Sequence, residues 1–122
     1  MINPVNWFEI YVQDVNRAKT FYEAVFPFKL TKMESPEVEL WGFPMAKDVM
    51  GSSGALVKMD GVKSGGNSTI IYFSCEDCAV EAGKAEKAGG KIHKQKTSIG
   101  PYGHIALVLD SEGNMIGLHS MQ

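Results

Sequence analysis

The chain has 122 residues, a formal net charge of −2 at pH 7 and a charged fraction of 21%. This length fits one globular domain whose core is large enough to fold without a metal or a disulfide. The near-neutral charge provides no basic surface for phosphate contacts and the apolar runs are far too short to span a bilayer, so we expect neither a nucleic-acid nor a membrane partner.

The N-terminal residues have no basic start and no long apolar stretch, which favours a cytoplasmic location over secretion. Residues 7–12 combine aromatic and β-branched side chains, and this composition predicts a strand. Asp14 follows the strand and is suited to cap a helix over Val15–Val25, because a carboxylate accepts hydrogen bonds from the first helical turn. Four apolar residues share one face of that helix at i, i+3, i+4, i+7 spacing: Ala18, Phe21, Tyr22 and Val25.

Three more strands complete the first half of the chain. They are predicted over residues 28–32, 38–43 and 55–59. The loop Pro44–Ser53 before the last of them is long and contains Met and Gly, which fits either a mobile lid or a solvated hairpin end.

The second half repeats this order at an offset of 63 residues, from Asp14 to Asp77. A strand over 70–75 precedes Asp77, and a helix over 78–88 follows it, with Val80, Gly83 and Ala88 as its thinner apolar face. Further strands are predicted over residues 91–94, 103–109 and 115–119, with a hairpin turn at 110–114.

The repeat predicts an α+β fold in which two βαβββ modules form a single domain over residues 1–122. Module one covers about 1–60 and module two about 68–122. Between them, residues 60–67 are rich in Gly, Ser and Lys and are typical of a linker.

The two cysteines, Cys75 and Cys78, have the C-x-x-C spacing of metal or redox sites. A structural zinc site needs further ligands, and no second pair is present. One cysteine is at the end of a predicted strand and the other is at the start of a predicted helix. Two hypotheses are therefore open: the pair has a redox role, or the two are small residues packed at that corner.

Two motifs give the sequence a resemblance to a known family. Residues 14–22 read D-x-x-R-A-x-x-F-Y, and residues 110–114 read D-S-E-G-N directly before the last strand. This combination resembles the vicinal-oxygen-chelate superfamily, which groups glyoxalase I, bleomycin-resistance proteins and extradiol dioxygenases. The resemblance covers nearly the whole chain. It implies a large curved mixed sheet with a concave cleft on one side, helices on the other side, and a homodimer.

The resemblance also places the family's metal ligands, which are His, Gln or Glu side chains that project into the cleft. The positions lie seven residues before each capping Asp and four residues after the glycine of the last turn, and here they hold Trp7, Ile70 and Gly117. The fourth lies within Gly54–Val57, which has no acid or histidine. We therefore expect no cofactor and a cleft without a metal.

Strand alternation predicts which side chains face the cleft. They are Trp7, Glu9, Tyr11, Ile70, Tyr72, Ser74, Met115, Gly117 and His119. Gly117 leaves room beside them. The intervening residues are expected to point at the helices and to form the core: Phe8, Ile10, Val12, Ile71, Phe73 and Cys75.

Two of these residues are candidates for catalysis, with Glu9 as general base and His119 as acid or orienting group. A carboxylate in an apolar strand such as Glu9 is either paired with a basic residue or functional. His119 could equally be half-exposed near the chain end. A shifted metal site of Glu9, His119 and His104 for zinc, nickel, manganese or iron is a further alternative.

Ligand binding is predicted for six residues: Trp7, Tyr11, Tyr72, Ile70, Gly117 and His104. Trp7 is either a stacking platform or a plug in the space of the lost metal, and His104 could instead lie at the surface. Three hypotheses for function follow. The protein binds a small aromatic or cationic molecule as bleomycin-resistance proteins do, it is a lactoylglutathione-lyase-like lyase or isomerase, or its own aromatics fill the cleft.

Overall fold

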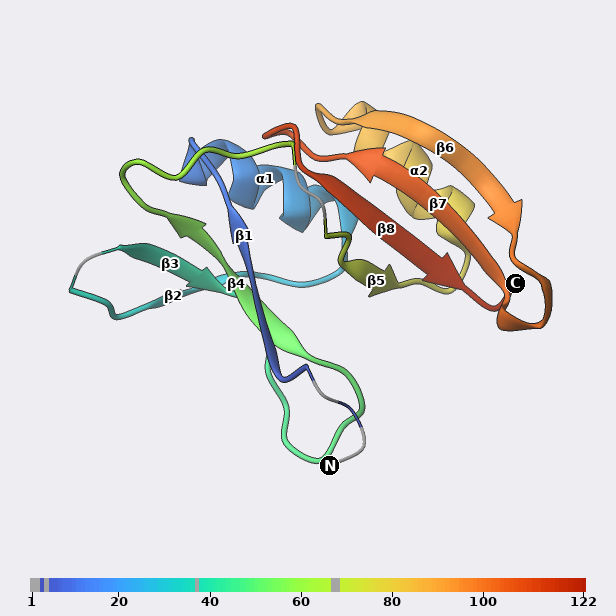
Figure 1. The fold of residues 1–122 in the computed structure, drawn as a ribbon, viewed down its shortest axis with the longest axis horizontal. Helices are drawn as coiled ribbons and strands as arrows, with labels where there is room; N and C mark the ends of the chain where they lie inside the picture. Colours follow the sequence, from blue (N-terminus) through green and yellow to red (C-terminus); the bar gives the residue numbers. More distant parts are fainter. Residues whose placement is uncertain (1–2, 4, 37, 67–68) are drawn as a thin grey trace.

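The computed structural model describes residues 3, 5–36, 38–66 and 69–122. They form two four-stranded sheets, and Figure 1 shows the sheets side by side with both α-helices on the same side of them. Asn67 and Ser68, where the predicted linker ends and module two begins, lie outside the described residues, as do three residues of the N-terminal segment. No helix in the described ranges has the length and apolar character needed to cross a membrane.

The first half of the chain forms one sheet in the order β1-β4-β3-β2. Its elements are β1 (Trp7–Tyr11), α1 (Val15–Val25), β2 (Thr31–Met33), β3 (Glu39–Gly42) and β4 (Ser53–Lys58). β1 runs parallel to β4, and the other neighbouring strands are antiparallel.

The second half forms the equivalent sheet in the order β5-β8-β7-β6, with β5 parallel to β8. Its elements are β5 (Tyr72–Ser74), α2 (Cys78–Lys87), β6 (Lys91–Ser98), a short 3₁₀ helix η1 (Gly100–Tyr102), β7 (His104–Leu109) and β8 (Met115–Ser120). The predicted α+β fold of two βαβββ modules is confirmed. The hydrogen bonds divide the strands into two sheets rather than one continuous sheet, because β1 and β5 are edge strands that do not pair with each other in the described chain.

Both helices begin where the capping residues predict. The Asp14 carboxylate accepts a hydrogen bond from the Arg17 N–H at 3.0 Å, and the Asp77 carboxylate accepts one from the Ala79 N–H at 3.0 Å. The predicted face of α1 is fully buried. The prediction of the buried face of α2 is partly wrong, because Val80 is 51% exposed.

The face that α2 does bury consists of small residues: Cys78, Ala82 and Ala85. Small side chains let the helix lie close to β6, β7 and β8, which it contacts. Alanine is spread around this helix, so hydrophobic contrast alone does not identify the buried side.

Aromatic rings fill the contact between the two modules. Phe73 of β5 stacks on Phe26 at 4.7 Å between ring centroids and meets the edge of Phe8 of β1 at 6.1 Å. Tyr22 of α1 and Phe43 lie in the same cluster, with 5.5 Å between their ring centroids. Burial of this shared apolar surface holds the modules together. Phe8, Ile10, Val12, Phe73 and Cys75 lie in or against the core as predicted, whereas Ile71 lines a cavity at the module junction.

A polar contact adds to this aromatic core. The turn between β7 and β8 brings the Glu112 carboxylate to the start of α1, where it accepts hydrogen bonds from the backbone N–H groups of Gln13 and Asp14 at 2.9 and 3.0 Å. Arg17 pairs with the same carboxylate. The D-S-E-G-N turn is therefore more than a hairpin connection, since it ties module two to the helix of module one.

Candidate functional site

The helices leave one face of each sheet uncovered, and we refer to these surfaces together as the open face. On β1, Phe8 and Ile10 pack into the core, so Trp7, Glu9 and Tyr11 lie on the open face, as the strand alternation predicts. In the second sheet, Phe73 and Leu118 pack into the core, and the open face carries Tyr72 beside Gly117 and Ser74 beside His119.

Glu9 is the centre of a small hydrogen-bonded cluster on β1. Its carboxylate accepts a hydrogen bond from the Tyr11 hydroxyl at 2.8 Å and one from the Trp7 indole N–H at 3.3 Å. The hydrogen bond to Glu9 raises the pKa of Tyr11, with smaller contributions from burial and from the negative charge. These two donors hold the carboxylate in a defined position at the surface.

Glu9 itself is exposed, so the cost of a buried charge does not apply to it. Among the residues that the structure describes, no basic side chain pairs with it within 4.0 Å. Of the two alternatives for Glu9, pairing with a basic residue is therefore not observed among the described residues. Its oxygens are oriented by neighbours but not neutralised by them.

Glu9 and Tyr11 line a cavity of about 210 Å³ at the junction of the two modules, which we call the junction cavity. Its other lining residues come from both modules and from the linker: Ile10, Val62, Lys63, Gly65, Thr69, Ile71, Asn114, Met115 and Ile116. Most of the wall is apolar, and the polar side chains on it are Glu9, Tyr11, Lys63, Thr69 and Asn114. A mostly apolar wall with several polar groups is typical of a small-molecule site.

Lys63 is a charged residue of the cavity that the sequence did not single out. It lies in the linker, whose Gly, Ser and Lys content predicted only a connection between modules. The sequence feature that could have indicated a role for Lys63 is its position as a cationic residue in a short linker between two modules that share a site. Met115 was predicted to face the cleft and lines the junction cavity.

Gly117 does not leave open space on β8. A Cβ atom at this position would lie 2.5 Å from the ring of Tyr72, which covers the glycine. Tyr72 is nevertheless 45% exposed, so one side of its ring is available to a ligand. Ile70 precedes β5 and is also exposed.

The two candidate histidines lie on different faces of the second sheet. His119 is on the open face, with its Nε2 atom 2.6 Å from the Tyr102 carbonyl oxygen, which requires a proton on Nε2. His104 is the register partner of Ser120, which is buried and bonded to the first residue of α2. His104 is therefore not brought together with the other predicted site residues. Within the described chain, no hydrogen bond or cavity joins His119 to Glu9.

The donor set does not fit the family's metal. Trp7, Ile70 and Gly117, which the resemblance in sequence places at three of the ligand positions, have no side-chain atom that coordinates a metal ion. In the described ranges, no group of three or more His, Cys, Asp or Glu side chains is placed to hold a metal ion. This includes the shifted set of Glu9, His104 and His119.

The cysteines lie at a strand–helix corner. Burial raises the pKa of the Cys75 thiol to about 12, with a smaller contribution from the Glu81 carboxylate. Cys78 is fully buried at the start of α2. A raised thiol pKa opposes thiolate chemistry, so the packing hypothesis for this pair is favoured over a redox role.

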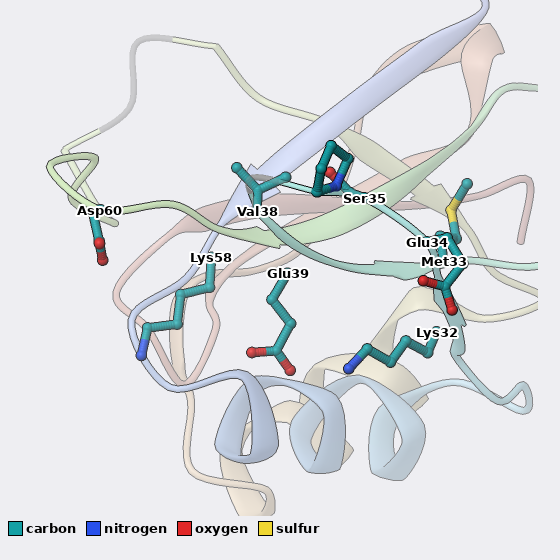
Figure 2. Close-up of a pocket in the computed structure, with 9 residues that line it drawn as sticks. Lys32, Met33, Glu34, Ser35, Val38, Glu39, Lys58 and Asp60 are labelled. Atoms are coloured by element: carbon teal, nitrogen blue, oxygen red, sulfur yellow. The ribbon is translucent and has the colours of Figure 1, made fainter.

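Further hollows lie outside the junction cavity in the described residues. The loop Pro44–Ser53 and Trp7 enclose a space of about 630 Å³ beside β1. Figure 2 shows a charged groove at the edge of the first sheet, where Lys32, Glu39 and Lys58 extend toward α1. That groove is on the helix-covered side, away from the predicted site.

The paired βαβββ modules, with helices on one side and an open face on the other, define the class of this protein. Its sequence matches the family model of the Glyoxalase/Bleomycin resistance protein/Dioxygenase superfamily over residues 4–118. The chain belongs to this superfamily. A search of curated proteins gives no significant match.

Solved structures support the same fold. Glyoxalase I from Zea mays is similar with a TM-score of 0.76 and 23% identity over 97% of this chain, which spans 46% of the maize protein. A glyoxylase/bleomycin resistance protein/dioxygenase domain from a Frankia species has a TM-score of 0.74 and 16% identity, with complete coverage of both chains. The antibiotic-binding protein TnmS3 from a Streptomyces species has a TM-score of 0.71 and 23% identity, covering 98% of this chain and 96% of its own. At these identities the likeness establishes the fold alone.

Proposed function

We propose that this protein binds a small molecule in the junction cavity without a metal or other cofactor. The carboxylate of Glu9 accepts a hydrogen bond or pairs with a positive charge on the ligand. Tyr11 and the apolar cavity wall contact the ligand body, and Trp7 and Tyr72 offer aromatic surface on the open face beside it. The observation that carries the proposal is a carboxylate oriented by two donors at an apolar cavity and not paired with a cation among the described residues.

Orientation of Glu9 before binding lowers the cost of association. A carboxylate that is already fixed by the Trp7 and Tyr11 donors loses little side-chain freedom when a ligand arrives. A cationic ligand would also gain from the adjacent aromatic rings. The resemblance in fold to an antibiotic-binding protein is consistent with this role.

A lyase or isomerase of the glyoxalase I type is the alternative, with Glu9 as base and His119 as acid. General acid–base catalysis requires both groups within reach of one substrate. Glu9 lines the junction cavity, whereas His119 does not and contacts the Tyr102 carbonyl. We therefore favour binding over catalysis.

The test measures binding of 2-phenylethylamine, a small aromatic cation, by calorimetry. Glu9→Gln removes the charge and should weaken binding about tenfold. The matched control is Glu39→Gln, because Glu39 also accepts an indole N–H, from Trp41 at 3.1 Å, but on the helix-covered side. Equal affinity of the Glu9→Gln variant and the unmodified protein would reject the proposed site.

We also propose that two copies associate as a homodimer in the cytoplasm. Several apolar side chains are exposed on the loop beside β1: Met45, Val49 and Met50. Contiguous exposed apolar surface often marks an interface. Light scattering of the purified protein should give the mass of a dimer, and the mass of one chain would reject this part of the proposal.

A further inference from the structure

The junction cavity has a positive charge as well as a negative one on its lining. Lys63 of the linker and Glu9 of β1 both contribute to its wall. Within the described residues, neither side chain forms an ion pair within 4.0 Å, with each other or with another residue. Two opposite charges therefore border one small apolar space without neutralising each other.

The linker backbone is fixed on both sides of Lys63. On one side, the Val62 carbonyl accepts a hydrogen bond from the Gln13 side chain at 3.0 Å. On the other side, the Ser64 hydroxyl donates to the Glu112 carbonyl at 2.8 Å. Next along the chain, the Gly65 N–H donates to the Asn114 side chain at 2.6 Å.

These contacts bind the linker to module one through Gln13 and to module two through Glu112 and Asn114. The backbone of Lys63 is consequently held at the cavity, although its side chain is exposed and free to adjust. A lysine on a fixed backbone is suited to meet an anionic group as a point charge.

The remaining wall of the cavity is largely apolar, with Tyr11, Thr69 and Asn114 as its other polar residues. Ile71, Met115 and Ile116 line it from the second module. The volume of about 210 Å³ lies below the roughly 300–1,000 Å³ of sites for drug-sized ligands, so the ligand is small. Charge complementarity then favours both signs of charge on one compact molecule.

We propose that the junction cavity takes an amphoteric ligand of about amino-acid size. Its carboxylate or other anionic group pairs with Lys63, its ammonium group or other donor pairs with Glu9, and an apolar side group contacts Ile71 and Met115. This inference rests on the proposed function, since it names the class of ligand for the same site.

Three probes with one aromatic body test the inference by calorimetry: phenylalanine carries both charges, 2-phenylethylamine only the positive one, and 3-phenylpropanoate only the negative one. We expect phenylalanine to bind about tenfold more tightly than either singly charged probe. Lys63→Met should reduce the affinity for phenylalanine about tenfold. 2-Phenylethylamine has no anionic group to pair with Lys63, so this variant should bind it at least as tightly as the unmodified protein does.

Lys58→Met is the matched control, because Lys58 is also exposed and lies outside the junction cavity. It should change none of the affinities. The inference is overturned if phenylalanine binds no more tightly than 2-phenylethylamine, or if Lys63→Met weakens both probes equally.

The two proposals fail in different ways. If binding of 2-phenylethylamine depends on Glu9 but phenylalanine binds no more tightly, the proposal of an amphoteric ligand is wrong and the proposed binding site is supported. If no probe binds, both proposals are rejected.

Discussion

The Tyr22 hydroxyl donates a hydrogen bond to the Asp110 carboxylate at 2.7 Å, and this bond joins two modules across 88 residues of sequence. Both residues are buried. Asp110 also accepts hydrogen bonds from the backbone N–H groups of Glu112 and Asn114, both at 2.8 Å. The helix of module one and the last turn of module two are thus coupled at a site from which water is excluded.

Tyr22→Phe should destabilise the fold although it keeps the aromatic packing. The variant removes one donor from a buried carboxylate, and an unsatisfied buried group costs about 1–3 kcal/mol. Urea unfolding followed by circular dichroism measures the loss. Tyr102→Phe is the control, because Tyr102 is 73% exposed. A Tyr22→Phe variant as stable as this control would show that the bond contributes nothing.

The lowered pKa of Glu112 predicts how the stability of the fold depends on pH. Burial raises its pKa, but hydrogen bonds from Arg17 and from the backbone N–H groups of Asp14 and Gln13 outweigh burial, so the pKa is lowered from 4.5. Because the folded-state pKa lies below the unfolded one, the ionised carboxylate stabilises the fold above about pH 4.5. This contribution is lost as the pH falls through the lowered folded-state value.

Glu112→Gln should therefore lower the free energy of unfolding by about 1–3 kcal/mol at pH 7. The difference from the unmodified protein should shrink as the pH falls below 4, which urea titrations at several pH values can measure. The stability contribution of Asp110 depends on pH in the opposite direction. Burial raises the pKa of Asp110, so its contribution is present at low pH and declines as the pH rises through the raised value. A constant difference between the two proteins from pH 7 to pH 3 would contradict the assignment for Glu112.

Gly117→Ala should displace the ring of Tyr72. The new methyl group would lie 2.5 Å from ring atoms, and forced repacking costs about 1–3 kcal/mol. The double variant Gly117→Ala, Tyr72→Ala should regain stability relative to what the two single variants predict when added together. Thermal unfolding of all four proteins gives this coupling energy. Simple additivity would mean that the ring already moves freely off the glycine.

Cys75 and Cys78 should react slowly with thiol reagents in the folded protein. Burial raises the pKa of Cys75 to about 12, so almost no thiolate is present at pH 7. Labelling with a maleimide, detected by mass spectrometry, should be slow in buffer and complete in denaturant. Rapid labelling of the folded protein at pH 7 would instead support a reactive thiol pair.

Local features of the sequence predicted much of the fold. The caps Asp14 and Asp77, the buried face of α1 and the repeat of the βαβββ order were all readable, because capping and hydrophobic periodicity depend on neighbours along the chain. Strand alternation likewise placed Trp7, Glu9 and Tyr11 on one face. That Trp7, Ile70 and Gly117 have no metal-coordinating side chain is a statement of residue identity, and their assignment to the family's metal positions stays a prediction.

Only the tertiary structure decided which of these residues meet. The linker brings Lys63 to the cavity through contacts with Gln13 and Glu112, which are far from it in sequence. The ring of Tyr72 covers Gly117, and the register of β7 with β8 puts His104 on the opposite face from His119. The position of Lys63 depends on how the two modules pack, and the other two relationships depend on strand pairing within module two. Both are set by contacts between residues that are not neighbours along the chain, so no local pattern in the sequence shows them.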